Sequence, residues 1–239
     1  MHNRYDIKVV GEQEPTGSRI FFEEKGRRIS PWHDIPLYAN EANGLLNMVV
    51  EIPKGTNAKL EISKEEDYNP IKQDTNHGGL RYLADIPPFK GYPCNYGAFP
   101  QTYESPDILD GKTGVQGDDD PLDVCEIGNE PAYPGEVKTV KVLGAIAILD
   151  QGQTDWKIIA VDINDSLSSK LTDISDVEVH LPEFLGKLKD WYCLYKIPEG
   201  KPPNEVALCG QLQDRRSALE LISHFHGTWK SMEKKAGSQ

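Results

Sequence analysis

Four aspartates stand together in residues 117–128, GDDDPLDVCEIG, and the chain turns apolar directly after them. Two carboxylates about 4 Å apart repel each other by roughly 4 kcal/mol at an effective dielectric constant near 20, so such a group needs a neutralising partner. Pro121 fixes a turn, and the apolar residues that follow are typical of a half-buried strand. We therefore expect Asp118, Asp120 and Asp123 at the ordered mouth of a strand.

Hard oxygen ligands with no His or Cys nearby suit Mg²⁺ or Mn²⁺ better than zinc, and magnesium suggests phosphate chemistry. A calcium loop counted from Asp118 would need Gly and Glu where Asp123 and Asn129 stand. An aspartyl phosphatase motif would need Thr in place of Leu122, and GKTG at 111–114 lacks the first glycine of a phosphate-binding loop. A solvated acidic turn stays the alternative explanation for the three consecutive aspartates alone.

The composition restricts the class of protein. A formal net charge of -12 argues against nucleic-acid partners, which require an excess of Lys and Arg, and favours cations. With 38% hydrophobic residues and a mean hydropathy of -0.54, the chain is typical of one that folds in water. Four scattered cysteines form no C-x-x-C pair, so a zinc site and a disulfide framework are not indicated and a reducing compartment fits best. No apolar signal core and no stretch of about 18 apolar residues is present, so we expect neither secretion nor membrane insertion.

Hydrophobic periodicity predicts a β-rich middle and a helical C-terminal part. Strands are predicted at 45–52, 56–62, 81–85, 122–127, 137–149 and 156–163. In the second of these, Lys59 and Glu61 share a face because side chains alternate along a strand. Apolar spacings of three and four predict helices at 181–195 and 214–235, which would cover a sheet or barrel. The Pro- and Gly-rich connection 86–114 is too long for an idle loop in a compact domain, so we expect it to carry function.

A second acidic group lies in LDQGQTDWK, residues 149–157, where Asp150 and Asp155 follow the long apolar strand. Alone, this segment is typical of a hairpin turn. Together with EIPKGTNAKLEI, GLRYL, GYPCNYGAFPQT and LYKIPEGKP, it closely resembles the family I soluble inorganic pyrophosphatases. The signature of that family, of the form D-x-D-P-x-D, is met by Asp118, Asp120, Pro121 and Asp123.

The resemblance runs from ISPWHDIPLY to HGTWK, and its motifs occur in the family's order and close to its spacing. We therefore expect one domain over 1–239, divided into an N-terminal extension of eukaryotic type (1–28), a family core (29–230) and a polar tail (231–239). The fold that the resemblance implies is mainly β (α+β), with a small closed five-stranded OB-like β-barrel flanked by helices.

The function that the resemblance implies is Mg²⁺-dependent hydrolysis of inorganic pyrophosphate to two orthophosphates, by a metal-bridged water that an aspartate activates. Such an enzyme drives biosynthetic reactions that release pyrophosphate. The resemblance also implies a homodimer, and Mn²⁺ as a substitute for Mg²⁺. The lack of a signal sequence predicts a cytoplasmic location.

Individual roles follow from the resemblance, motif by motif. The implied metal ligands are Asp118, Asp123, Asp155, Asp150 and Glu61, with Glu51 as a weaker candidate. Asp120 is implied as the base that accepts the proton of the attacking water. Phosphate binding is implied for Arg81, Lys59, Tyr96, Tyr195, Lys196, Tyr92 and Lys157. Seven acids against four bases leave this set at -3, and pyrophosphate adds roughly -3 to -4, so we expect about three to four Mg²⁺ per site.

Two other classes of function stay open at this point. Barrels of the OB type can bind single-stranded nucleic acid through aromatic and basic surfaces, but the charge of -12 argues against that use here. An inactive scaffold with the same fold would be expected to lack a metal-binding aspartate, and none of those named above is missing.

Overall fold

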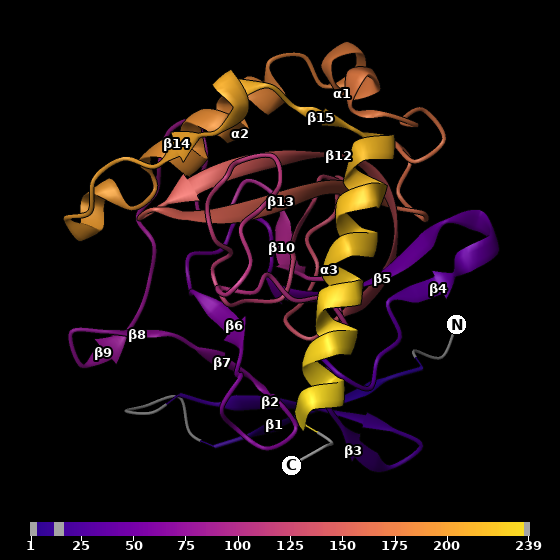
Figure 1. Cartoon of the computed structure of the whole chain (residues 1–239). Helices are drawn as coiled ribbons and strands as arrows, with labels where there is room; N and C mark the ends of the chain where they lie inside the picture. The colour runs from indigo at the N-terminus through magenta and orange to yellow at the C-terminus, as the bar shows by residue number, and fades with distance from the viewer. Residues whose placement is uncertain (1–3, 12–16, 237–239) are drawn as a thin grey trace.

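The computed structural model describes residues 4–11 and 17–236, and its sheets form the centre of the molecule (Figure 1). The larger sheet contains β4 (Tyr38–Asn40), β5 (Leu45–Ile52), β10 (Asn95–Ala98), β11 (Asp123–Glu126), β12 (Val137–Asp150), β13 (Gln153–Asp162), β14 (Glu205–Val206) and β15 (Gln213–Asp214). The smaller sheet contains β1 (Asp6–Val10), β2 (Arg19–Glu24), β3 (Arg27–Ile29), β6 (Leu60–Ile62) and β7 (Ile71–Gln73). A short hairpin is formed by β8 (Thr75–Asn76) and β9 (Gly79–Leu80).

Five strands of the larger sheet close into a ring. Strand β12 pairs with β13, β13 with β11, β11 with β10, β10 with β5, and β5 pairs again with β12. The pairing of β11 with β13 is parallel and the other four are antiparallel. This closed ring confirms the predicted mainly β fold with a small five-stranded barrel.

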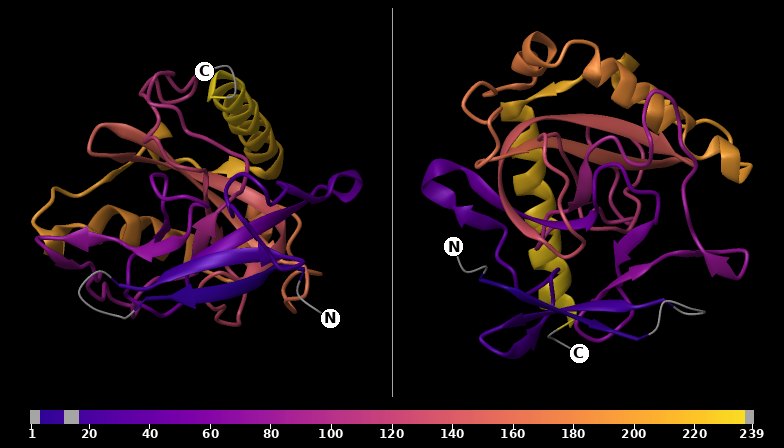
Figure 2. Two further views of the ribbon diagram at one scale, coloured as in Figure 1. Left: turned by 90° about the horizontal axis from the view of Figure 1, so that it is seen from below. Right: turned by 180° about the vertical axis from the view of Figure 1, so that it is seen from behind.

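Helices cover this barrel on two sides. They are α1 (Ile174–His180), α2 (Phe184–Leu194) and α3 (Arg215–Ala236), and short 3₁₀ turns occur at Glu41–Asn43, Ile197–Glu199 and Leu208–Gly210. Figure 2 shows α1 and α2 at one end of the molecule and the N-terminal strands of the smaller sheet at the opposite end. Among the described residues, no helix combines the length and the apolar character needed to cross a membrane.

The long apolar run of β12 is explained by burial on both of its faces. Ile146 and Ile148 pack in a cluster with residues of α1 and α2, whereas Ala145 and Ala147 pack in a second cluster with α3. A strand that is covered on both faces needs no polar alternation, so its sequence is continuously apolar. The predicted helices at 181–195 and 214–235 are confirmed, since α2 and α3 lie within one to three residues of those limits.

Two of the predicted strands are wrong in extent. Only Leu60–Ile62 of the predicted 56–62 strand is regular, and 81–85 contains no strand but a single bridge between Tyr82 and Ala58. The cause is local, because Leu60 N donates to the Ala58 carbonyl at 3.0 Å and this tight turn stops the ladder from extending. The elements that were not predicted are the helix α1 and the strands β1, β2, β3, β4, β7, β8, β9, β10, β14 and β15. Of these, β10 lies inside the predicted connection 86–114, which is therefore not a continuous loop.

Strands β10 and β5 approach each other closely at Gly97. A Cβ atom on Gly97 would lie 1.9 Å from the carbonyl oxygen of Val49 and 2.9 Å from the Cα of Val50. We expect Gly97→Ala to lower the free energy of unfolding by about 3 kcal/mol or more, because backbone would have to move. Chemical denaturation measures this change.

The matched control for this prediction is Gly186→Ala in α2, where no atom lies within 4 Å of the added carbon. That variant should be neutral or slightly stabilised, since alanine favours helix. If Gly97→Ala lowers the free energy of unfolding by less than about 1 kcal/mol, strands β10 and β5 can move apart at this position without strain, and the prediction is wrong.

Candidate active site

A cavity of about 200 Å³ is lined by all of the predicted ligand, base and phosphate-binding residues except Glu51, the weaker candidate. Thirteen predicted residues contribute to its lining: Lys59, Glu61, Arg81, Tyr92, Tyr96, Asp118, Asp120, Asp123, Asp150, Asp155, Lys157, Tyr195 and Lys196. Three further residues of the lining, Gln151, Gln153 and Tyr192, were not predicted. The fold therefore brings together segments that lie far apart in the sequence.

The barrel strands position the centre of this cavity. Parallel pairing of β11 with β13 places Asp123 directly opposite Lys157. Asp155 precedes Lys157 by two residues on β13, so the two side chains share a face, and their ion pair measures 2.5 Å. Asp150 ends β12, and the tight turn to β13 returns the chain to the same edge.

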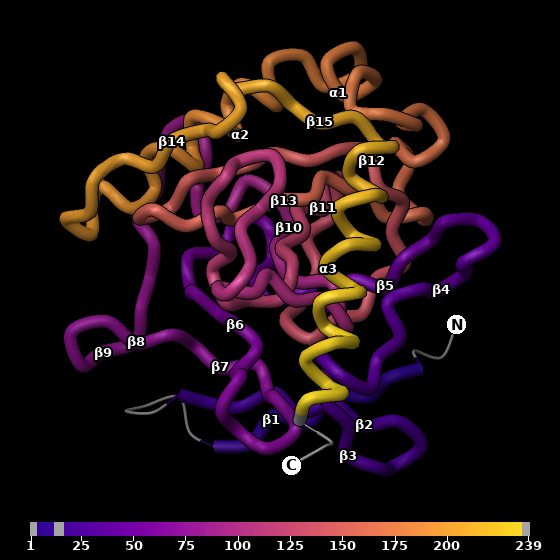
Figure 3. Tube along the Cα trace, in the orientation of Figure 1, coloured from indigo at the N-terminus to yellow at the C-terminus, as the bar shows by residue number. Residues whose placement is uncertain are grey.

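Asp118 and Asp120 lie on the connection between β10 and β11, residues 99–122. Figure 3 shows this connection folded beside α3, where Tyr103 N donates to the carbonyl of Phe225 at 3.2 Å. Thr102 Oγ1 accepts a hydrogen bond from Leu122 N at 2.9 Å, which closes the base of the loop. The connection is thus anchored at both ends, and the two aspartates are held at the cavity.

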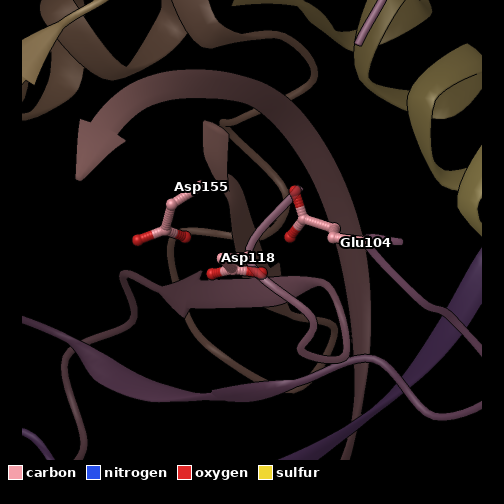
Figure 4. A group of neighbouring side chains, drawn as sticks. All are labelled: Glu104, Asp118 and Asp155. Atoms are coloured by element: carbon pink, nitrogen blue, oxygen red, sulfur yellow. The ribbon is translucent and has the colours of Figure 1, made fainter. Parts of the chain in front are cut away.

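Three carboxylates form an acidic centre beside the cavity, which Asp118 and Asp155 line and Glu104 does not. Each of Glu104, Asp118 and Asp155 offers an oxygen within 4.8 Å of the others, and Figure 4 shows the three carboxylates facing one another. Burial, reinforced by the nearby Asp155 and Asp120 carboxylates, raises the pKa of Asp118 well above its usual range. Burial also raises the pKa of Asp155 to about 7, although Lys157 opposes this shift.

A divalent cation fits this acidic centre. The donors are all hard carboxylate oxygens, as Mg²⁺ and Mn²⁺ prefer, and like charges this close repel strongly when they are ionised together. Glu104 Oε2 is buried and has no hydrogen-bond partner among the described residues, so it is an oxygen that a cation or its hydration water can satisfy.

Lys157 links the acidic centre to the aromatic side of the cavity. Its ammonium contacts the carboxylates of both Asp123 and Asp155, and Tyr96 donates its hydroxyl proton to Asp123 at 2.5 Å. Burial would lower the pKa of Lys157, but the carboxylates of Asp123 and Asp155 outweigh it and raise the pKa well above its usual value. Lys157 therefore stays cationic.

Arg81 presents a partly engaged guanidinium to the cavity. Its Nε and Nη2 donate to the Glu199 carboxylate at 2.8 and 2.7 Å, and its Nη1 donates to Asp74 at 2.9 Å. A guanidinium has five N–H donors, so two remain for another acceptor. The guanidinium, for which the resemblance implies phosphate binding, is thus occupied on one side by Glu199.

The remaining cationic and aromatic residues form pairs around the cavity. The predicted shared face of Lys59 and Glu61 is confirmed by an ion pair of 3.6 Å. Lys196 contacts the carboxylate of Asp150. The ring of Tyr195 stacks on Trp191 with centroids 4.8 Å apart and planes within 8°. Because these aromatic rings are buried and packed, they hold the cavity wall in place.

Tyr92 and Glu51 complete the set of predicted residues. Burial raises the pKa of Tyr92, which packs against Tyr96 with ring centroids 5.0 Å apart. Glu51 Oε1 accepts a hydrogen bond from Ile62 N at 2.7 Å, and burial raises the pKa of Glu51 to about 8. Glu51 lines an adjacent cavity rather than the one described above.

Sequence reasoning missed three charged residues at this site: Glu104, Lys64 and Glu199. Lys64 Nζ lies 2.8 Å from Asp120 and 2.9 Å from Asp119. Asp119 adopts a left-handed backbone with φ of 72° and accepts a hydrogen bond from the Tyr103 hydroxyl at 2.5 Å. No periodicity or motif marks the three missed residues, because tertiary folding alone brings them next to residues that line the cavity.

The site thus sets an acidic cluster against Arg, Lys and Tyr side chains at the mouth of a closed barrel. This combination is typical of enzymes that use metal ions to act on phosphates. A family model described as inorganic pyrophosphatase matches residues 48–230. The chain belongs to the inorganic pyrophosphatase family, and the resemblance to its family I soluble members of eukaryotic type is confirmed.

Individual relatives agree with this membership. An inorganic pyrophosphatase of Debaryomyces hansenii is 51% identical over 230 residues, which are 96% of this chain and 80% of the relative. The solved inorganic pyrophosphatase of Schistosoma japonicum matches with a TM-score of 0.93 and 44% identity, covering 95% of this chain and 80% of that one. An N-terminally truncated vacuolar soluble pyrophosphatase of Trypanosoma cruzi, solved in complex with PPi, matches with a TM-score of 0.88 and 36% identity. The match covers 98% of this chain and 92% of that one.

Proposed function

We propose that this chain hydrolyses inorganic pyrophosphate to two orthophosphates with Mg²⁺ as its cofactor, water as the nucleophile and Asp120 as the base. The observation that carries the proposal is the single cavity in which acidic residues suited to metal ions face cationic residues suited to phosphate. Family membership and the relatives named inorganic pyrophosphatase support the same reaction.

Asp118, Asp123 and Asp155 are the residues that would hold the tightest cation, with Asp150 and Glu61 contributing to others. Two divalent ions bound there would neutralise charge and acidify a water molecule that attacks the phosphorus. Asp120 stands apart from the buried aspartates, with its side chain 53% exposed. It is thus open to the cavity, where it can accept the proton of an attacking water.

The cationic residues then have a binding role. Arg81 keeps two N–H donors for phosphate oxygens, and Lys59 and Lys196 add point charges. Each of these lysines has a carboxylate partner, Glu61 or Asp150, that is itself a candidate metal ligand. When a cation takes over the carboxylate, the ammonium group becomes available to the substrate.

Direct attack by water can be separated from an aspartyl-phosphate route by acid quenching. The protein is mixed with ³²P-labelled pyrophosphate and Mg²⁺, quenched in acid during the first turnover, and tested for protein-bound label. We expect label only in pyrophosphate and orthophosphate. Label that stays on the protein and is lost in Asp118→Asn or Asp120→Asn would contradict the water mechanism.

Several expectations from the sequence stay predictions. The division of the chain into 1–28, 29–230 and 231–239 is among them, and residues 1–3, 12–16 and 237–239 of it lie outside the described residues. So are the roles of the individual site residues and three further expectations. They are the homodimer, the cytoplasmic location, and the use of three to four Mg²⁺ per site with Mn²⁺ as a substitute.

A further inference from the structure

We propose that Glu104 is an additional carboxylate donor of the cation cage that Asp118 and Asp155 form. The inference rests on the proposed function, because it takes the acidic centre to be a metal site. Glu104 lies in YESP, outside the D-x-D-P-x-D signature and outside the second acidic segment.

The geometry places the Glu104 carboxylate in the cage. An oxygen of Glu104 lies within 4.8 Å of oxygens of both Asp118 and Asp155, and Figure 4 shows that it approaches from the side opposite to Asp155. Ligands on one Mg²⁺ ion lie about 2.1 Å from the metal, so two opposite ligands are about 4.2 Å apart. The three carboxylates therefore need only small side-chain movements to surround one cation.

One oxygen of Glu104 lacks any other role among the described residues. Oε1 accepts a hydrogen bond from Trp156 N at 3.2 Å, whereas Oε2 is buried without a partner. The whole residue is only 1% exposed, so bulk water cannot satisfy Oε2. A buried oxygen in this situation is costly unless a cation or a bound water occupies the space that it faces.

The backbone of Glu104 also fixes the loop that carries the aspartates. Glu104 N donates to the Asp120 carbonyl at 2.9 Å, and Asp119 N donates to the Glu104 carbonyl at 2.9 Å. The contact is tight, since a Cβ on Gly117 would lie 2.5 Å from the Glu104 carbonyl oxygen. Glu104 and Asp118 are thus held at a fixed separation, as a preformed metal site requires.

The test is Mg²⁺ binding to the pyrophosphate-free protein, measured by titration calorimetry for wild type and for Glu104→Gln. Gln keeps the size of the side chain and the acceptor for Trp156 N but removes the charge. We expect the Kd of the tightest Mg²⁺ to rise by about 10- to 100-fold. The melting temperature without metal should be unchanged or higher, because an uncompensated buried carboxylate is removed.

The matched control is Glu126→Gln. Glu126 is equally buried, but Gly128 N, Asn95 Nδ2 and Asp162 N already satisfy its carboxylate, and it lies outside the acidic centre. Its substitution can cost stability but should leave the Kd for Mg²⁺ within about twofold of wild type. A second variant, Glu104→Asp, keeps the charge at a shorter reach and should give an intermediate Kd.

If Glu104→Gln binds its tightest Mg²⁺ with the same Kd as wild type, whatever its melting temperature, the inference is overturned and Glu104 has a structural role only. If Glu104→Gln does not fold, the Kd of Glu104→Asp for Mg²⁺ decides instead, and a value equal to that of wild type would overturn the inference. A wild-type protein that binds Mg²⁺ and hydrolyses pyrophosphate while both Glu104 variants bind equally well refutes this inference alone. A folded wild-type protein that binds no Mg²⁺ and releases no phosphate refutes the proposed function as well.

Discussion

The Asp120→Asn variant should lose about 10²-fold or more of kcat while its fold and its metal binding stay nearly unchanged. The amide keeps the shape of the side chain but cannot accept the proton of the attacking water. Asp120 is suited to this role because it faces the cavity beside the buried aspartates, and Lys64, 2.8 Å away, fixes its position. Steady-state phosphate release at saturating Mg²⁺ and pyrophosphate gives kcat.

The neighbouring residue offers the control for this prediction. Asp119 also pairs with Lys64, at 2.9 Å, but it bonds to Tyr103 and does not line the cavity. Asp119→Asn should therefore keep kcat within a few-fold of wild type. Unchanged turnover in Asp120→Asn would remove Asp120 from the mechanism, and an equal loss in both variants would point to the shape of the loop instead.

The second large effect is expected for Asp123→Ala, which should weaken activation by Mg²⁺ severely. The Asp123 carboxylate accepts a hydrogen bond from the Tyr96 hydroxyl at 2.5 Å, and the Lys157 ammonium contacts it as well. The family resemblance implies that Asp123 contacts a second ion as well as the tightest one, so its loss should raise the Mg²⁺ concentration for half-maximal rate by about 10- to 100-fold. The rate as a function of free Mg²⁺ measures this shift.

The control here is Asp190→Ala on the exposed surface of α2, which should titrate like wild type. Melting curves recorded without metal would show whether Asp123→Ala is folded. If its Mg²⁺ titration superimposes on that of wild type, Asp123 is not a ligand shared between two ions.

Much of the fold and site could be predicted because the information is local in the sequence. The signature residues Asp118, Asp120 and Asp123 lie within six positions of one another, and Asp155 and Lys157 lie two residues apart on a single strand, so they share a face. The closed ring needed the family resemblance, since periodicity detects strands but not the return of β12 to β5.

What could not be predicted depends on tertiary contacts. Glu104 and Lys64 reach the site only because the connection 99–122 folds back, through hydrogen bonds such as that from Glu104 N to the Asp120 carbonyl. Glu199 ends the 3₁₀ turn Ile197–Glu199 after the predicted helix, and only the tertiary packing of that turn brings it to Arg81, which it holds in a bidentate pair. The helix α1 escaped prediction because seven residues are too few for a clear apolar period.

The most direct test of the central claim is orthophosphate release from pyrophosphate by the purified protein, with Mg²⁺ present and then removed by a chelator. We predict two orthophosphates for each pyrophosphate consumed, loss of the activity with the chelator, and its return when Mg²⁺ is restored. No release with Mg²⁺, Mn²⁺ or Zn²⁺ from a folded sample would contradict the account, because the aspartate cage would then serve binding or a different phosphate substrate.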